Sequence, residues 1–159
     1  MLNFFQNLSP ELIIASLSAL PFTELRGSIP IALGVYKLPV VTAFFLAVLG
    51  NIAAAVLVLL GLEFFSGYLM RKFSLANRFL NWLFKRTRES HQKKFEGWKE
   101  LALMLFVAVP LPLTGAWSGA LCSFIFGIPV KRAIIAISLG VVIAGLLVTL
   151  ISYGAINCC

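Results

Sequence analysis

Two oppositely charged side chains, Glu24 and Arg26, lie two residues apart in a stretch that is otherwise apolar. The stretch runs from Pro21 to Pro30 and has Gly27 near its centre. A charge at the centre of a bilayer costs roughly 2.5–3.5 kcal/mol on insertion scales, so such residues are rare there and usually functional. Two interpretations are open: an ion pair that only permits both charges to be buried, or a proton or ion switch beside an anion site.

The chemistry of this pair follows from its two side chains. Burial disfavours the charged form of a carboxyl group and a nearby arginine favours it, so small rearrangements can change the protonation of Glu24. Arg26 keeps its charge and can form paired hydrogen bonds to a phosphate or a carboxylate. The other predicted substrate- or ion-binding residues offer hydroxyl groups, close backbone approach or a break in the chain. They are Thr23, Gly27, Pro30, Thr114, Gly115 and Ser118.

The composition is that of an integral α-helical membrane protein. Of the 159 residues, 60% are hydrophobic and 12% are charged, whereas charged residues make up about 25% of soluble domains. The mean hydropathy is +0.99. The chain has no Asp, its cysteines lack metal-ligand spacing, and its one histidine, His91, lies among charged residues. We therefore expect no enzyme, no catalytic residues, no metal and no cofactor.

Two broken apolar segments each precede a long apolar helix. The short runs of the broken segments are 12–20, 31–36, 101–109 and 120–128. The long helices are predicted at 40–62 and 133–152. A nine-residue helix is about 14 Å long, which is half a bilayer. Each broken segment is therefore either one kinked span or a re-entrant hairpin, whose irregular backbone must be covered by protein or line a water-filled cavity.

An internal repeat relates the two halves of the chain. A shift of 90 residues aligns 39–60 with 129–150 without a gap, and nine of the 22 aligned positions are identical. One further residue of slippage aligns Leu20–Thr23 with Leu111–Thr114. Each half is therefore predicted to be a broken segment followed by a full helix.

Basic residues gather between the two repeats. The predicted single membrane domain, 1–159, divides into repeat 1 at 9–62, a linker at 63–99 and repeat 2 at 100–156. The linker holds nine of the 13 Lys and Arg residues, interleaved with aromatic residues at helical spacing. This pattern is typical of an amphipathic helix on the anionic head groups of the cytoplasmic leaflet. A solvated basic loop that only sets the topology is the alternative. Either explains the net charge of +7 without nucleic acid.

The distribution of charge favours re-entrant hairpins over kinked spans. With two hairpins, Lys131 and Arg132 lie on the same side as the linker, whereas two full crossings would place them outside, against the positive-inside rule. We expect an all-α, multi-pass protein of the inner membrane with both termini outside and a cytoplasmic linker. Its two halves form an inverted repeat of two units, each a re-entrant helical hairpin followed by a transmembrane helix. In transporters of that design, broken helices form the substrate and ion site near the midplane.

Two motifs carry a resemblance to a known family. They are Glu24-x-Arg26-Gly27-x-Ile29-Pro30, followed by Gly34, and Pro110-x-Pro112-x-Thr114-Gly115-Ala116. With them the chain resembles the putative small multidrug export proteins, which are small bacterial and archaeal membrane proteins. That family is grouped with the DedA-type membrane proteins, and this implies paired re-entrant loops that face each other. Some DedA-type relatives move lipid carriers such as undecaprenyl phosphate, and an acidic residue and an arginine in the loops matter there. The matching positions here are Glu24 and Arg26, whereas the second loop of this chain has no charged residue.

The leading hypothesis is a small membrane transporter or lipid flippase for an anionic or amphipathic substrate, with proton coupling through Glu24. Two hairpins and two spans are few elements with which to enclose a pathway, so we expect a homodimer or a higher homo-oligomer. Membrane lipids are the other predicted partners, at the basic linker. The alternatives are a non-transporting scaffold or assembly protein with a structural Glu–Arg pair, and a passive channel.

Overall fold

The computed structural model of the chain describes residues 9–72, 96–110 and 114–158. Within these residues all regular secondary structure is helical. The helices are α2 (Pro10–Ala19), α3 (Glu24–Gly34), α4 (Val40–Lys72), α6 (Glu96–Ala108), α7 (Ala116–Ile125) and α8 (Val130–Cys158). Two of them are long and apolar enough to cross a membrane, over Val40–Phe65 and Val130–Ile156. The all-α prediction is confirmed for the described residues.

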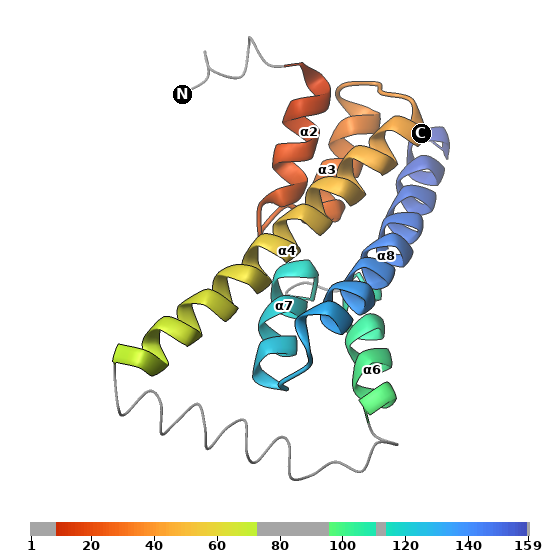
Figure 1. The fold of residues 1–159 in the computed structure, drawn as a ribbon. Helices are drawn as coiled ribbons and strands as arrows, with labels where there is room; N and C mark the ends of the chain where they lie inside the picture. The colour runs from red at the N-terminus through yellow and green to blue at the C-terminus, as the bar shows by residue number, and fades with distance from the viewer. Residues whose placement is uncertain (1–8, 73–95, 111–113, 159) are drawn as a thin grey trace.

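Each long helix follows a pair of short helices that run in opposite directions (Figure 1). In this view α2 runs down from the upper end, α3 returns to it, and α4 then runs to the lower end. The second half does the reverse: α6 runs up, α7 returns, and α8 runs to the upper end. The junction of α2 with α3 and the facing ends of α6 and α7 therefore lie near the middle of the molecule.

The two halves interleave. In each half the first short helix packs on the long helix that follows it, α2 on α4 and α6 on α8. The second short helix of each half also packs on the long helix of the other half, α3 on α8 and α7 on α4. One apolar core joins them, with Ile29 of α3, Val48 of α4, Val107 of α6 and Ile137 of α8 among its buried members. The core thus lies where the halves meet.

Helix α3 differs from its prediction. Gly27 and Pro30 were expected to interrupt the chain, but α3 runs without a break through both. The N–H of Gly27 donates to the Thr23 carbonyl at 2.8 Å. Pro30 removes only the donor that would face the carbonyl of Arg26, and a helix packed among others in a membrane protein tolerates such a loss. The predicted second break at these residues is therefore wrong.

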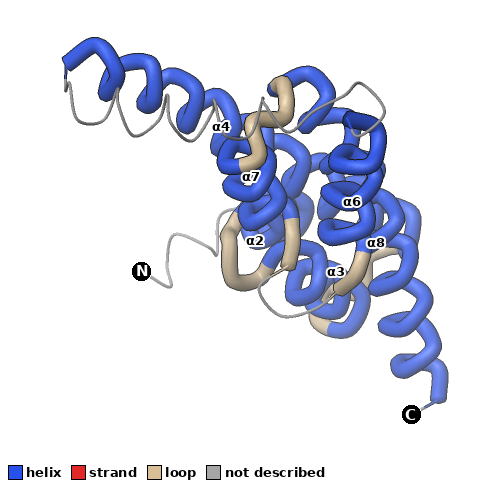
Figure 2. Tube along the Cα trace, turned by 90° about the horizontal axis from the view of Figure 1, so that it is seen from below, coloured by secondary structure: helices blue, strands red, loops and turns tan. Residues whose placement is uncertain are grey.

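Helix α4 also extends beyond its prediction. It continues to Lys72 rather than ending at Leu62, so the first part of the predicted linker is a continuation of the long helix. Its C-terminal turns project away from the other helices (Figure 2). The rest of the predicted amphipathic helix, from 73 to 95, and His91 with it, lie outside the described residues.

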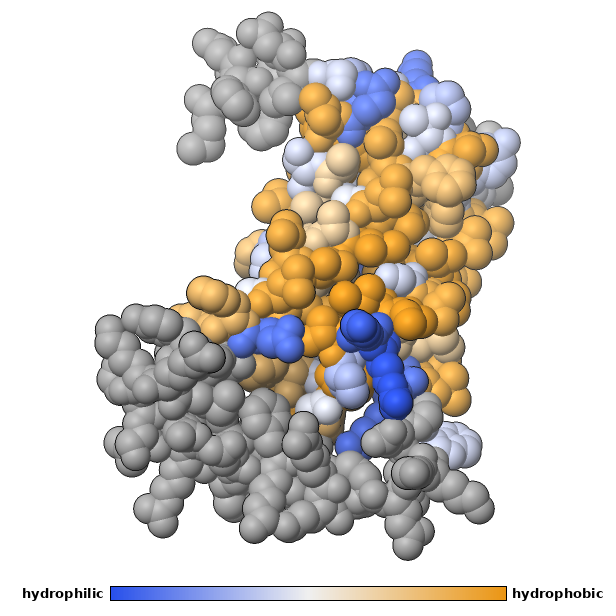
Figure 3. All heavy atoms as spheres, in the orientation of Figure 1, coloured by the Kyte–Doolittle hydropathy of each residue, from blue (hydrophilic) through white to orange (hydrophobic). Residues whose placement is uncertain are grey.

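The described surface carries a broad apolar band. In Figure 3, hydrophobic residues cover the middle of this face, and hydrophilic residues lie near its upper end and in its lower part. Large side chains on both long helices contribute, such as Leu57, which is 71% exposed, and Leu150, which is 70% exposed. An apolar surface of this extent is typical of contact with a membrane, in agreement with the composition.

Gly50 and Gly140, which the repeat aligns, have corresponding contacts. A Cβ atom on Gly50 of α4 would lie 2.5 Å from the Ala15 carbonyl oxygen of α2. A Cβ atom on Gly140 of α8 would lie 2.7 Å from the Met104 carbonyl oxygen of α6. Each long helix therefore needs a glycine where the short helix of its own half approaches it, as is common at helix contacts in membranes.

Replacing Gly50 by alanine is expected to lower the free energy of unfolding by about 1–3 kcal/mol, because the new methyl group would overlap a backbone atom. Thermal unfolding of the purified protein in detergent measures this loss. The control is Gly61→Ala on the same helix, where a Cβ atom would meet no heavy atom within 4 Å. Equal melting temperatures for the two variants would contradict the close approach of α2 to α4.

Candidate functional site

Glu24 is the first residue of α3, and its side chain reaches the first turn of α7. The residue is 9% exposed. Its carboxylate accepts a hydrogen bond from the backbone N–H of Trp117, and a Cβ atom on Gly115 would lie 2.5 Å from its Oε1 atom. The first N–H groups of a helix have no partner within the helix, and the helix dipole favours a negative charge there. The carboxylate therefore caps α7 from the other half of the chain.

The backbone of Glu24 is strained. Its φ angle is 42°, in the left-handed region that residues other than glycine and asparagine seldom adopt. The conformation costs roughly 1–2 kcal/mol for a residue with a Cβ atom, and glycine would avoid this cost. The contact of its carboxylate with the start of α7 therefore explains why a glutamate, and not a glycine, occupies this position. Strain of this kind is found most often at functional sites.

Arg26 also contacts the second half. Its Nη2 atom donates to the carbonyl oxygen of Thr114, and to the Thr114 Oγ1 atom at 3.1 Å. The Thr114 hydroxyl donates in turn to the carbonyl of Val109 at 2.8 Å, which leaves its oxygen oriented to accept from the guanidinium. Both charged side chains of the first broken segment therefore contact the second broken segment.

A cleft opens beside this contact. Its volume is about 720 Å³, within the range of roughly 300–1,000 Å³ that ligand pockets occupy. Five of the predicted site residues line it: Thr23, Glu24, Arg26, Thr114 and Ser118. Apolar side chains, including Phe22, Trp117 and Leu121, form much of the rest. The cleft therefore combines charged, hydroxyl and apolar groups.

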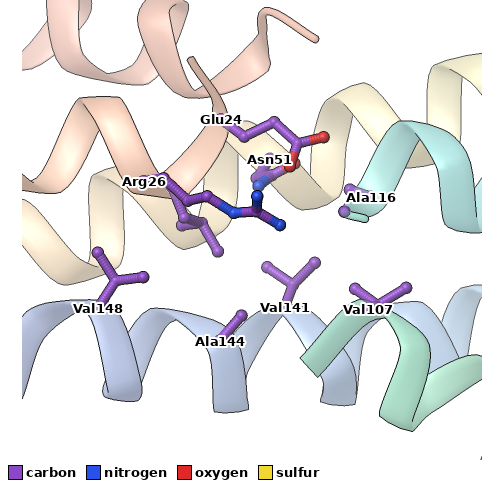
Figure 4. Close-up of a pocket in the computed structure, with 10 residues that line it drawn as sticks. Glu24, Arg26, Asn51, Val107, Ala116, Val141, Ala144 and Val148 are labelled. Atoms are coloured by element: carbon purple, nitrogen blue, oxygen red, sulfur yellow. The ribbon is translucent and has the colours of Figure 1, made fainter. Parts of the chain in front are cut away.

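A second, much smaller cavity also lies beside the pair. It measures about 10 Å³, enough for about one water molecule. Glu24 and Arg26 line this cavity as well as the cleft. Figure 4 shows their side chains beside Asn51 of α4, facing Val141 and other apolar side chains of α8. The charged pair is therefore shared by the cleft and the smaller cavity.

The remaining predicted site residues form local hydrogen bonds or lie outside the site. The Ser118 hydroxyl accepts from the N–H of Gly115 at 2.9 Å and so stabilises the start of α7. The Thr23 hydroxyl donates to the carbonyl of Leu17. Gly27 and Pro30 lie on α3 and line neither the cleft nor the cavity. The structure therefore brings six of the eight predicted residues together and leaves these two outside the site.

Two further residues belong to the site, although neither is among the site residues predicted from the sequence. Asn51 lines the cavity. Trp117 lines the cleft, and its Nε1 atom donates to the carbonyl of Ala19 at 3.0 Å. The repeat holds a signal for both, because it aligns Asn51 with Val141 and Arg26 with Trp117. Each alignment pairs a polar or charged side chain with an apolar or aromatic one.

Comparison with known proteins identifies one protein family. The sequence model of a family described as "Putative small multi-drug export protein" matches residues 24–147, which is well over half of the chain. The match begins at Glu24 and includes Gly115. No curated protein and no solved structure matches the chain.

Proposed function

The chain belongs to the family of putative small multi-drug export proteins, and we propose that it is a small membrane transporter or lipid flippase. Its substrate is anionic or amphipathic and passes Glu24 and Arg26. The observation that carries this proposal is the contact between the two broken segments. The carboxylate and the guanidinium of the first segment are held on the backbone of the second, beside a cleft of about 720 Å³.

The chemistry of the cleft favours an amphipathic anion. A guanidinium has five N–H donors, and the contact with Thr114 leaves donors for the phosphate or carboxylate of a substrate. Phe22 is 98% exposed and, with Leu121, offers apolar surface for a hydrocarbon part. A lipid with an anionic head group matches both the charged part and the apolar part of the cleft. Proton coupling would act through Glu24, the only carboxylate among the described residues that line the cleft.

The proposal includes a membrane arrangement. Each half is a re-entrant hairpin followed by a transmembrane helix, and the two halves are inverted relative to each other, as in DedA-type proteins. The reversed order of α2–α4 and α6–α8 in Figure 1 and the matching contacts of Gly50 and Gly140 support it. The protein would lie in the inner membrane with outer termini, a cytoplasmic linker on anionic lipid, and a second copy to complete the pathway. It would perform no catalysis and need no cofactor.

The test is lipid movement in liposomes that contain the purified protein and fluorescent phosphatidylglycerol. Dithionite added outside quenches the outer leaflet, and continued quenching reports lipid arriving from the inner leaflet. We expect wild-type protein to accelerate this phase and Glu24→Gln to slow it about tenfold, because the neutral amide accepts a weaker hydrogen bond than the carboxylate and cannot carry a proton.

The matched control is Glu100→Gln, which removes the same charge from a surface ion pair with Arg132, 3.3 Å long. It should move lipid at the wild-type rate. A folded Glu24→Gln protein as active as wild type would refute the site. If Glu24→Gln unfolds instead, the pair is structural and the scaffold function is favoured.

A further inference from the structure

Asn51 has an unexplained polar atom in the core. It is the only strongly polar residue between 40 and 62 in the long helix α4. The residue is 1% exposed, and its Oδ1 atom has no hydrogen-bond partner among the described residues. Buried amide oxygens are almost always hydrogen-bonded, to protein or to ordered water. The missing partner of Asn51 therefore points to a ligand.

The cavity beside Asn51 defines what that ligand is. Asn51 and Glu24 both line it, so an amide group, which can donate and accept, and a carboxylate, which accepts, border the same space. Its volume of about 10 Å³ admits about one water molecule. A cation would also suit two acceptors, but the Arg26 guanidinium lines the same cavity and repels it. Among the described residues, no cluster of His, Cys, Asp or Glu side chains suits a metal ion.

We propose that this cavity binds one water molecule, which donates one hydrogen bond to Asn51 Oδ1 and the other to the Glu24 carboxylate. Figure 4 shows the side chains of Glu24, Arg26 and Asn51 close together, with Val141 and Ala144 of α8 facing them. Among the described residues, Arg26 is the only other titratable side chain that lines either the cavity or the cleft. Glu24 is therefore the carboxyl group to which the water would donate.

The water gives the Glu24 carboxylate a further hydrogen-bond donor, in addition to the N–H of Trp117. The cleft and the cavity that would hold the water both border this residue. This role in proton coupling rests on the proposed function, whereas the water site itself does not. Proton uptake by Glu24 would rearrange this hydrogen bond, because a protonated carboxyl group donates where a carboxylate accepts, and Asn51 would orient the water that adjusts to the change.

The water site is tested by infrared difference spectra of the full-length protein in lipid, recorded between two pH values in ordinary water and in water labelled with heavy oxygen. Wild-type protein should show a sharp water band that shifts with the label. Asn51→Leu, which keeps the size of the side chain but lacks the acceptor, should lose this band. The control Ser28→Ala removes another fully buried oxygen without a partner, outside the cavity, and should keep the band.

Persistence of the band in Asn51→Leu, or its absence from wild-type protein, would overturn the proposal. A change of the band when sodium replaces a large organic cation would also overturn it, in favour of a cation site. The transport role is read separately, as lipid movement driven by a pH gradient. It should be lost in Asn51→Leu and kept in Ser28→Ala. The expected band without wild-type transport would refute the proposed function and leave the water site standing; transport without the band would do the opposite.

Discussion

Arg26→Lys is expected to slow lipid movement by about tenfold or more, although lysine keeps the positive charge. The guanidinium contacts the carbonyl and the hydroxyl of Thr114 and still has donors for a substrate. A lysine ammonium has three donors at one point and cannot span both oxygens and a phosphate. One lost hydrogen bond to a charged group costs about 1.5–3 kcal/mol, and 1.4 kcal/mol corresponds to a factor of ten.

The dithionite assay in liposomes measures this rate, and gel filtration shows whether the variant keeps its fold. The matched control is Arg132→Lys, which makes the same change at the surface pair with Glu100. An exposed pair of this kind contributes about 0–1 kcal/mol, so the control should resemble wild type. An Arg26→Lys protein with the wild-type rate would mean that the charge alone suffices and that the contact with Thr114 is not needed.

Gly115→Ala is expected to displace the Glu24 carboxylate and to abolish transport. A Cβ atom there would lie 2.5 Å from both the Cδ and Oε1 atoms of Glu24. The φ angle of Gly115 is 170°, an extended conformation that alanine also adopts, so the effect arises from lost space and not from backbone strain. Overpacking of this kind lowers the free energy of unfolding by about 1–3 kcal/mol. Thermal unfolding and the liposome assay measure the two losses.

A double-mutant cycle makes this prediction specific. In Glu24→Ala the carboxylate is absent, so a methyl group on residue 115 has room, and the second substitution should cost much less than it does alone. Coupling between contacting residues is about 0.5–3 kcal/mol. Gly34→Ala is the control, because a Cβ atom there meets no heavy atom within 4 Å. Additive losses of stability in the cycle would show that Glu24 does not lie on Gly115.

The order of helices follows closely from the sequence. Apolar runs of half-bilayer and full-bilayer length, separated by proline and glycine, are local properties that the chain carries in full. The breaks in α3 predicted at Gly27 and Pro30 are wrong because packing on α8 and α4 outweighs the local preference of these residues. The predicted amphipathic helix of the linker falls largely on residues 73–95, outside the described part of the chain.

The composition of the site was only partly predictable. The charged pair stands out in an apolar sequence, and the repeat pairs Glu24 with Gly115, the residue on which its carboxylate lies. The cavity at Asn51 depends instead on how Val107, Val141 and Ala144 close around it. That packing arises from helices that are far apart in the sequence, so no local sequence pattern predicts it.

In the proposed arrangement the chain turns back between α2 and α3 inside the membrane, so that Glu24 and Arg26 lie at depth. Single cysteines in place of Glu11, at the start of α2, and Lys37, between α3 and α4, test it most directly in a protein whose native cysteines are replaced by serine. Both should react with a membrane-impermeant maleimide from the outside of intact cells, and a cysteine in place of Arg88 should react only in inverted vesicles. Reaction of residues 11 and 37 from opposite sides would contradict the account.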